Sequence, residues 1–117
     1  MLLNRFYIIV IALLLACAGC TSNNMVTKEV CPILPKQSLQ FVDVFDGTAE
    51  EMAMLIPDNA QDTDGYWLLG YVYDATRFVT IRCKYADGKT IDVKLLNKVE
   101  RCDYKIDIHD TLTLACK

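Results

Sequence analysis

The chain has 117 residues, with 12 basic and 15 acidic side chains and a formal net charge of −3. This length is enough for one small domain but not for two. The acidic balance argues against nucleic acid as a partner.

Residues 1–19 have the pattern of a secretory signal peptide. Arg5 precedes an uncharged run of 13 residues from Phe6 to Ala18, whereas a helix needs about 20 apolar residues to cross a bilayer. The small residues before Cys17 and Cys20 resemble the lipobox of bacterial lipoproteins, in which the cysteine that follows the cleavage site is acylated. The local pattern fits either cysteine.

The number of cysteines favours Cys20 as the acylated residue. Four more cysteines follow it, an even set: Cys31, Cys83, Cys102 and Cys116. Cleavage before Cys20 removes Cys17 and leaves those four to pair, whereas cleavage before Cys17 leaves Cys20 as an unpaired thiol in an oxidising compartment.

These observations predict a lipoprotein with three parts. Residues 1–19 form the signal peptide, residues 20–30 form a polar lipid-anchored tether, and residues 31–117 form a single disulfide-bonded domain. Acyl chains hold such a protein at a membrane without a spanning helix. Thr21 follows the acylated cysteine instead of Asp, so the lipoprotein sorting rule implies anchoring in the periplasm at the outer membrane and not the inner one.

In the N-terminal half, two strands and one helix are expected. "LQFVDVF", residues 39–45, is predicted to be a strand. "GTAEEMAMLIP" is predicted to be a short helix, with Thr48 and Glu51 as a capping box and Pro57 at its end. Its apolar stripe of Met52, Leu55 and Ile56 is expected to pack against the sheet, and "GYWLLGYVY", residues 65–73, is expected to be a further strand.

From residue 78 the apolar residues alternate with a period of two, which predicts half-buried strands. "FVTIRCKY" and "TIDVKL" are joined by Ala86-Asp87-Gly88, with glycine at the left-handed position of a three-residue hairpin loop. This loop places residue 83 opposite 91 and puts every apolar side chain on one face.

A second hairpin is predicted at the C-terminus. A three-residue loop at Ile108-His109-Asp110 places Cys102 opposite Cys116 on the same face, within bridging distance. We therefore favour the pairs Cys102–Cys116 and Cys31–Cys83 among the three possible connectivities. The predicted fold class is α+β: a small, mainly antiparallel sheet of β-hairpins with one short helix, held by two disulfides.

The sequence does not indicate catalysis. His109 lies beside Asp110 in a predicted turn without a Ser or Cys nucleophile. The cysteines lack the Cys-x-x-Cys pairs of structural zinc sites. We therefore expect a protein that is not an enzyme and has neither a cofactor nor a metal.

A long acidic segment is the most unusual feature of the composition. Between Lys36 and Arg77 there is no basic residue but there are eight acidic ones. Such a segment favours a basic protein partner. The contact residues predicted from charge and aromatic character are Asp58, Asp62, Asp64, Tyr66 and Trp67.

One family resemblance covers essentially the whole mature chain. Cys31-Pro32, "FDGTAEEMAMLIPD", "YW", "CKYADG", "RC" and a cysteine next to the end resemble small secreted proteobacterial proteins with an uncharacterised domain, some of them encoded within type VI secretion loci. The resemblance implies a disulfide-bonded periplasmic domain, although many relatives lack the lipobox.

Three functions follow from these observations. The first is a protein-binding lipoprotein that acts as an immunity or inhibitor protein against a type VI effector or another cell-envelope enzyme. The alternative from a different class is a structural envelope lipoprotein without a toxin partner. A carboxylate-dependent hydrolase is the third.

Overall fold

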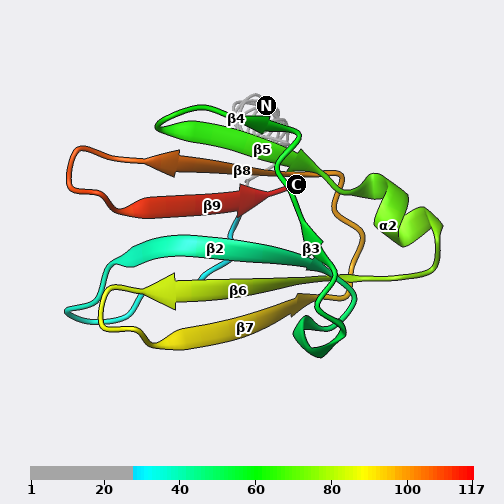
Figure 1. The fold of residues 1–117 in the computed structure, drawn as a ribbon, viewed down its shortest axis with the longest axis horizontal. Coiled ribbons are helices and arrows are strands. Elements are labelled where there is room, and N and C mark those ends of the chain that lie inside the picture. The colour runs from blue at the N-terminus through cyan, green and yellow to red at the C-terminus, as the bar shows by residue number, and fades with distance from the viewer. Residues whose placement is uncertain (1–27) are drawn as a thin grey trace, which may run out of the picture.

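The computed structural model describes residues 28–117. The predicted signal peptide, the predicted acylation site Cys20 and most of the predicted tether lie outside the described residues. The described part folds into two antiparallel sheets, with strand orders β1-β9-β8-β5-β4 and β3-β2-β6-β7 (Figure 1). The prediction of mainly antiparallel strands held by two disulfides is confirmed, but the strands form two sheets where one was predicted, and the helical content is small.

The elements follow one another along the chain with short connections. They are β1 (Lys28–Glu29), β2 (Leu39–Asp46), the 3-10 helix η1 (Ala49–Glu51), β3 (Met54–Leu55), β4 (Asn59–Ala60), β5 (Asp64–Leu68), α2 (Gly70–Asp74), β6 (Val79–Tyr85), β7 (Thr90–Leu95), β8 (Arg101–Ile106) and β9 (Leu112–Cys116).

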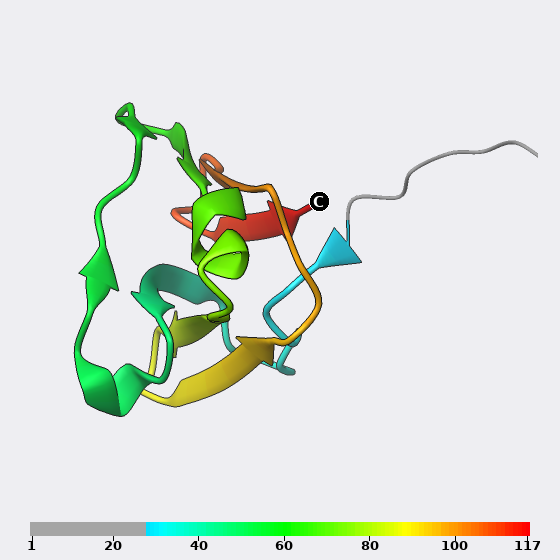
Figure 2. The same cartoon turned by 90° about the vertical axis from the view of Figure 1, so that its right-hand side faces the viewer.

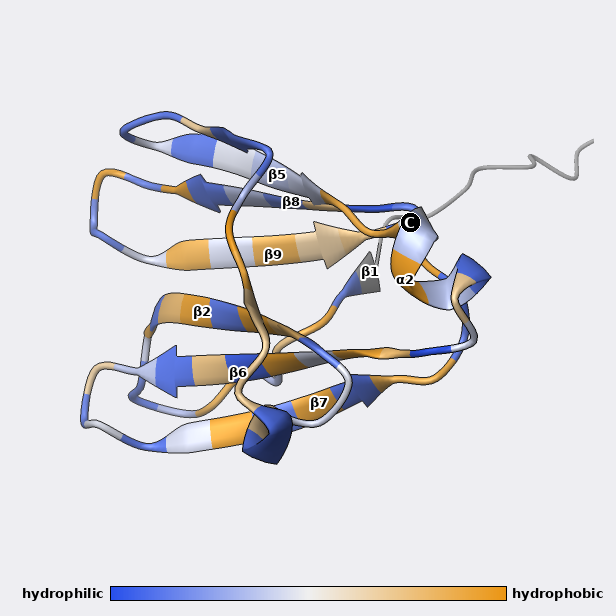
Figure 3. Ribbon diagram, turned by 45° about the vertical axis from the view of Figure 1, so that its right-hand side comes forward, coloured by the Kyte–Doolittle hydropathy of each residue, from blue (hydrophilic) through white to orange (hydrophobic). Residues whose placement is uncertain are grey.

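The hydrophobic core lies between the two sheets. Val44 and Ile81 face it from the four-stranded sheet, and Leu114 faces it from the five-stranded sheet. Leu69 and Val72, at the start of α2 and within it, complete the core at one end of the molecule. Figure 3 shows the alternation of hydrophobic and hydrophilic residues along the strands that this packing requires.

The first predicted hairpin is confirmed, including its register. Cys83 lies opposite Ile91 and Val79 lies opposite Leu95. The Tyr85 N–H donates to the Lys89 carbonyl (2.9 Å), and Gly88 adopts a φ of +87°. Glycine suits this position because a left-handed residue with a Cβ is strained.

The second hairpin also has the predicted register, with Cys102 opposite Cys116. Its loop repeats the geometry of the first one, and Asp110 takes the left-handed position with a φ of +56°. Disulfides join Cys102 to Cys116 and Cys31 to Cys83, which is the connectivity favoured from the register. The Cys31–Cys83 bond fixes the segment after β1 to the core strand β6.

The helix predicted over residues 47–57 is wrong beyond its first turn. The Thr48 N–H donates to Glu51 Oε2 (3.2 Å), as in a capping box, but the helical geometry ends at Met52, which has a φ of +59°. The chain then forms β3 along the edge of β2. An isolated helix of this length is marginal, and pairing with the free edge of β2 satisfies the same backbone groups.

The strand predicted over residues 65–73 is wrong in its second half. β5 ends at Leu68, and the next residues form α2. Leu69 and Val72 are both almost fully buried. A spacing of three residues brings both side chains to one side of a helical turn, whereas in a strand they would point to opposite faces.

Candidate binding site

A single segment joins the edges of the two sheets. We call residues 54–60, from β3 to β4, the strap. It pairs with β2 at one end and with β5 at the other. At the end of β3, Trp67 Nε1 donates to the Leu55 carbonyl (3.1 Å). Figure 2 shows the strap standing away from the strands behind it.

The strap leaves β2 because of a proline. The Asp46 N–H donates to the Ala53 carbonyl (2.9 Å), so the even-numbered residues of β2 direct their backbone groups toward β3. Continuing this antiparallel register places Val42 opposite Pro57, which has no N–H to donate. The ladder ends there, and by the same alternation the N–H and C=O of Val42 point to the side of β2 on which the strap lies.

That space is a cavity of about 350 Å³. Its walls are mainly apolar and come from both sheets and the strap. They include Phe41, Val44, Leu55, Trp67, Ile106 and Leu112, with Asp43, Gln61 and Asp62 as polar members. The ring of Tyr104 lies 5.4 Å from that of Trp67, centroid to centroid, and also lines the cavity. An apolar pocket with a few polar groups is the usual form of a ligand site.

Large apolar side chains surround this cavity and remain accessible to solvent. Phe41 and Met54 are each 56% exposed, and Ile56 is 86% exposed. Met52 nearby in sequence is 81% exposed. The expectation that Met52 and Ile56 pack against the sheet is therefore wrong, and only Leu55 of that stripe is half-buried. None of these exposed residues was predicted as functional, and for Met52 and Ile56 the reason is that apolar residues at helical spacing normally indicate a buried face.

Four of the eight acidic side chains in the acidic segment form ion pairs within the fold. Arg77 bonds both Asp46 (2.6 Å) and Glu51 (2.7 Å). The largely buried Asp43 pairs with Lys84 at 2.6 Å, and Lys98 lies 2.8 Å from Asp74. These cations come from sequence outside the acidic segment, so their effect is visible only in the tertiary structure.

Four acids of the segment form no ion pair with any residue of the described range: Glu50, Asp58, Asp62 and Asp64. Asp58 instead accepts a hydrogen bond from the Leu68 N–H at 2.6 Å. The pKa of Tyr71 on α2 is raised, first by partial burial and then by the carboxylates of Asp58 and Asp46.

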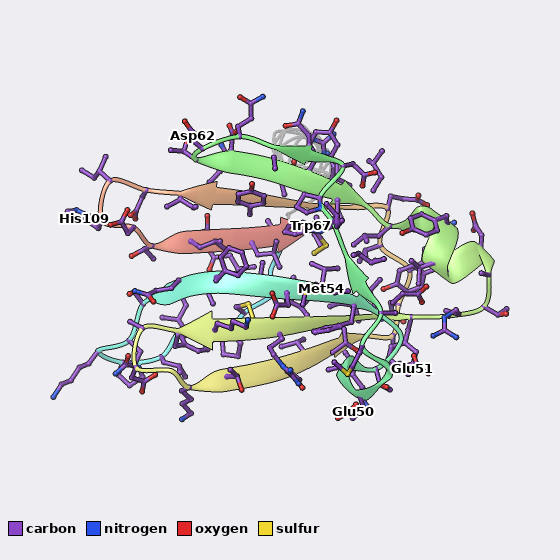
Figure 4. All side chains as sticks on the ribbon, viewed as in Figure 1. Glu50, Glu51, Met54, Asp62, Trp67 and His109 are labelled. Atoms are coloured by element: carbon purple, nitrogen blue, oxygen red, sulfur yellow. A yellow bond between two sulfur atoms is a disulfide. The ribbon has the colours of Figure 1, made fainter. Side chains whose placement is uncertain are left out.

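The five predicted contact residues do not form one surface. Asp62 lines the cavity, and Figure 4 shows it at the tip of the β4–β5 hairpin. Asp64 and Tyr66 line a second, polar groove, which shares Gln61 and Tyr104 with the cavity. Asp58 has the structural role described above. Trp67 is only 5% exposed, so in this conformation a partner reaches it through the cavity and not at the surface.

In the polar groove that Tyr66 lines, the Arg101 side chain contacts both Tyr66 and Asp103. The Arg101 guanidinium lies 3.7 Å from the centre of the Tyr66 ring. The same guanidinium bonds Asp103 at 2.8 Å. Asp103 lies opposite Tyr66 in the β5–β8 pair, which explains how the three side chains meet. An anionic group entering this groove would compete with Asp103 for Arg101.

His109 lies in the β8–β9 turn (Figure 4) and does not line the cavity. Its backbone N–H and that of Thr111 both donate to Asp107 Oδ1, at 2.8 and 3.0 Å. These bonds, first that from Thr111, lower the pKa of Asp107. No group of three His, Cys, Asp or Glu side chains within residues 28–117 is arranged to hold a metal ion. Within the same range, no helix has the length and apolar character needed to span a membrane.

The fold and this site define a small disulfide-bonded β protein with a strap-covered apolar cavity. No family model, curated protein or solved structure matches the chain significantly.

Proposed function

We propose that the protein is a periplasmic lipoprotein, anchored through Cys20, that binds and neutralises another protein. Its target is a basic type VI effector or another cell-envelope enzyme. The lipobox-like sequence before Cys20 supports the anchor, and the two disulfides support an oxidising compartment. The resemblance to proteins encoded in type VI secretion loci supports the immunity role.

The observation that carries this proposal is that an acidic side chain and exposed apolar side chains lie together around the cavity at the strap. Asp62, which is free of ion pairs within the described range, lies beside an apolar cavity whose rim exposes Phe41, Met54 and Ile56. Exposed apolar residues gathered around a concave site mark interaction surfaces, and aromatic anchors in water-excluding pockets carry much of the energy of protein interfaces. The unpaired carboxylates favour a basic partner.

The test is a contact-dependent competition between sibling cells. A strain that lacks the gene is grown on solid medium against its isogenic parent, and against a parent whose type VI apparatus is inactive. We expect the deletion strain to be outcompeted at least ten-fold by the active parent only. The wild-type gene restores survival, whereas Cys20→Ser does not, because the protein is no longer held where the target acts.

Two charge variants test the site within this assay. The double variant Asp62→Lys/Asp64→Lys should fail to protect, because it repels a basic partner. Glu50→Lys is the matched control, since Glu50 is exposed, lacks an ion pair in the described range and lies at the other end of the strap (Figure 4). A deletion strain that grows poorly in pure culture even when its own type VI apparatus is inactive would contradict immunity and favour the structural lipoprotein.

A further inference from the structure

We infer that the cavity beneath the strap binds one extended stretch of the partner protein, with an apolar side chain inside the cavity and a neighbouring basic side chain at Asp62. The inference rests on the proposed function and identifies the chemistry that the partner presents.

The size and lining of the cavity fit an apolar side chain. Its volume of about 350 Å³ lies at the small end of ligand pockets, which span about 300–1,000 Å³. Leu55 from the strap, Trp67 from β5 and Leu112 from β9 give the cavity apolar walls. An apolar residue that moves from water into such a site contributes roughly 1.5–3 kcal/mol by burial.

The backbone of Val42 indicates that the ligand carries amide groups. Its N–H and C=O point to the side of β2 on which the strap lies, and Pro57 supplies no N–H opposite them. The β2–β3 pairing ends at Val44, and the alternation of the β2–β6 ladder turns both groups away from β6, so neither takes part in these two pairings. A buried backbone group without a partner costs free energy, and an extended peptide supplies one donor and one acceptor at the spacing of a strand.

The charge at the cavity selects a basic neighbour. Two carboxylates line the cavity, but that of Asp43 is already paired with Lys84 at 2.6 Å. Asp62 has no cation within the described range, so it is the group available to the ligand. A lysine or arginine next to the apolar anchor would pair with it.

A fatty acid is the competing ligand for an apolar cavity, and the same groups disfavour it. Its carboxylate would meet the like charge of Asp62. Its hydrocarbon chain would leave both backbone groups of Val42 without partners. The peptide satisfies each of these groups, and the fatty acid satisfies none.

The experiment uses Trp67 as a reporter, because it is the one tryptophan of the chain and lines the cavity. The mature protein is titrated with the blocked pentapeptide acetyl-Ser-Leu-Lys-Ser-Gly-amide, and in parallel with peptides that carry Glu for Lys or Gly for Leu, and with decanoate. We expect a saturable change in Trp67 emission with the Leu-Lys peptide, and affinity at least three-fold weaker with both altered peptides.

Matched variants locate the binding. Asp62→Asn should weaken the Leu-Lys peptide about three- to ten-fold, whereas Glu50→Gln, at an exposed carboxylate that does not line the cavity, should leave it unchanged. Leu55→Phe fills the cavity and should abolish the response. Leu96→Phe is its control, since Leu96 is exposed and does not line the cavity. Near-ultraviolet circular dichroism verifies that each variant is folded.

The outcomes separate this inference from the proposed function. Binding of decanoate but not of the peptide, equal binding of the Lys and Glu peptides, or unchanged affinity in Asp62→Asn would each overturn the inference. Full protection of cells by Leu55→Phe would also overturn it while the proposed function stands. Peptide binding as expected, together with a deletion strain that survives the active parent, would support the inference and overturn the immunity role.

Discussion

The two C-terminal hairpins and the strap follow different physical rules. In β6–β7 and β8–β9, alternation of apolar residues and a left-handed third loop residue, Gly88 or Asp110, determine the register locally. The strap has no such alternation, and its path depends on the free edge of β2, on Pro57 and on the Trp67 indole. Local rules therefore produced the framework, and long-range contacts produced the cavity.

This difference has a consequence for function. The hairpins bury their apolar residues against the opposite sheet, whereas the strap leaves Met54 and Ile56 exposed. An element that is held by few contacts opens at lower free energy than the core strands. The strap is thus the part of the molecule suited to binding, and it is also the part that interactions between residues close in sequence stabilise least.

The largest expected effect comes from removing the long-range disulfide. The Cys31–Cys83 bond spans 52 residues and Cys102–Cys116 spans 14. Since the loop-closure entropy of the unfolded chain grows with loop length, Cys31→Ala/Cys83→Ala should cost about 4 kcal/mol, and Cys102→Ala/Cys116→Ala about 3 kcal/mol. Urea unfolding followed by circular dichroism measures both, and a larger loss for the hairpin bond would contradict this account.

A smaller effect is expected from Trp67→Phe, which removes the hydrogen bond to the Leu55 carbonyl. The variant should lose about 1 kcal/mol, and amide exchange should accelerate in residues 53–62 but not in the hairpins. Tyr73→Phe is the matched control, because the Tyr73 hydroxyl donates to the Leu95 carbonyl (2.7 Å) in β7. Faster exchange of the strap in both variants would show that Trp67 is not its specific anchor.

The smallest expected effect is the pH-dependent stability that the Asp107 carboxylate contributes in the β8–β9 turn. The folded state lowers the pKa of Asp107 through hydrogen bonds from Thr111 and His109. A carboxyl with a lowered folded pKa stabilises the protein above its unfolded pKa of about 3.9. This stabilisation is lost as the pH falls from there through the folded pKa.

Asp107→Asn should therefore be less stable than the wild type near neutral pH, and the difference should shrink on acidification below about pH 4. Denaturation midpoints at several pH values measure it. Asp87→Asn serves for comparison, because Asp87 accepts a single backbone bond, from the Lys89 N–H at 2.9 Å, in the other hairpin. A difference for Asp107→Asn that does not depend on pH would show that its carboxylate charge is not responsible.

The candidate site was predictable only in part. The acidic segment directed attention to Asp62, and the structure places this residue at the cavity. The same reasoning did not anticipate that Arg77, Lys84 and Lys98 neutralise four of the eight acids. Those cations lie more than 20 residues from their partners in all four pairs, so no local pattern in the sequence announces them.

By itself, the sequence determined the strand β2, both hairpins with their registers and the pairing of the four cysteines in the domain. These features depend on a period of two and on turn residues, which act over a few positions. Only the tertiary structure decided that residues 54–60 form a strap and that Trp67 lines a cavity. The physical reason is that a free sheet edge satisfies the backbone of a short segment better than an isolated helix does, and that edge is built by strands distant in sequence.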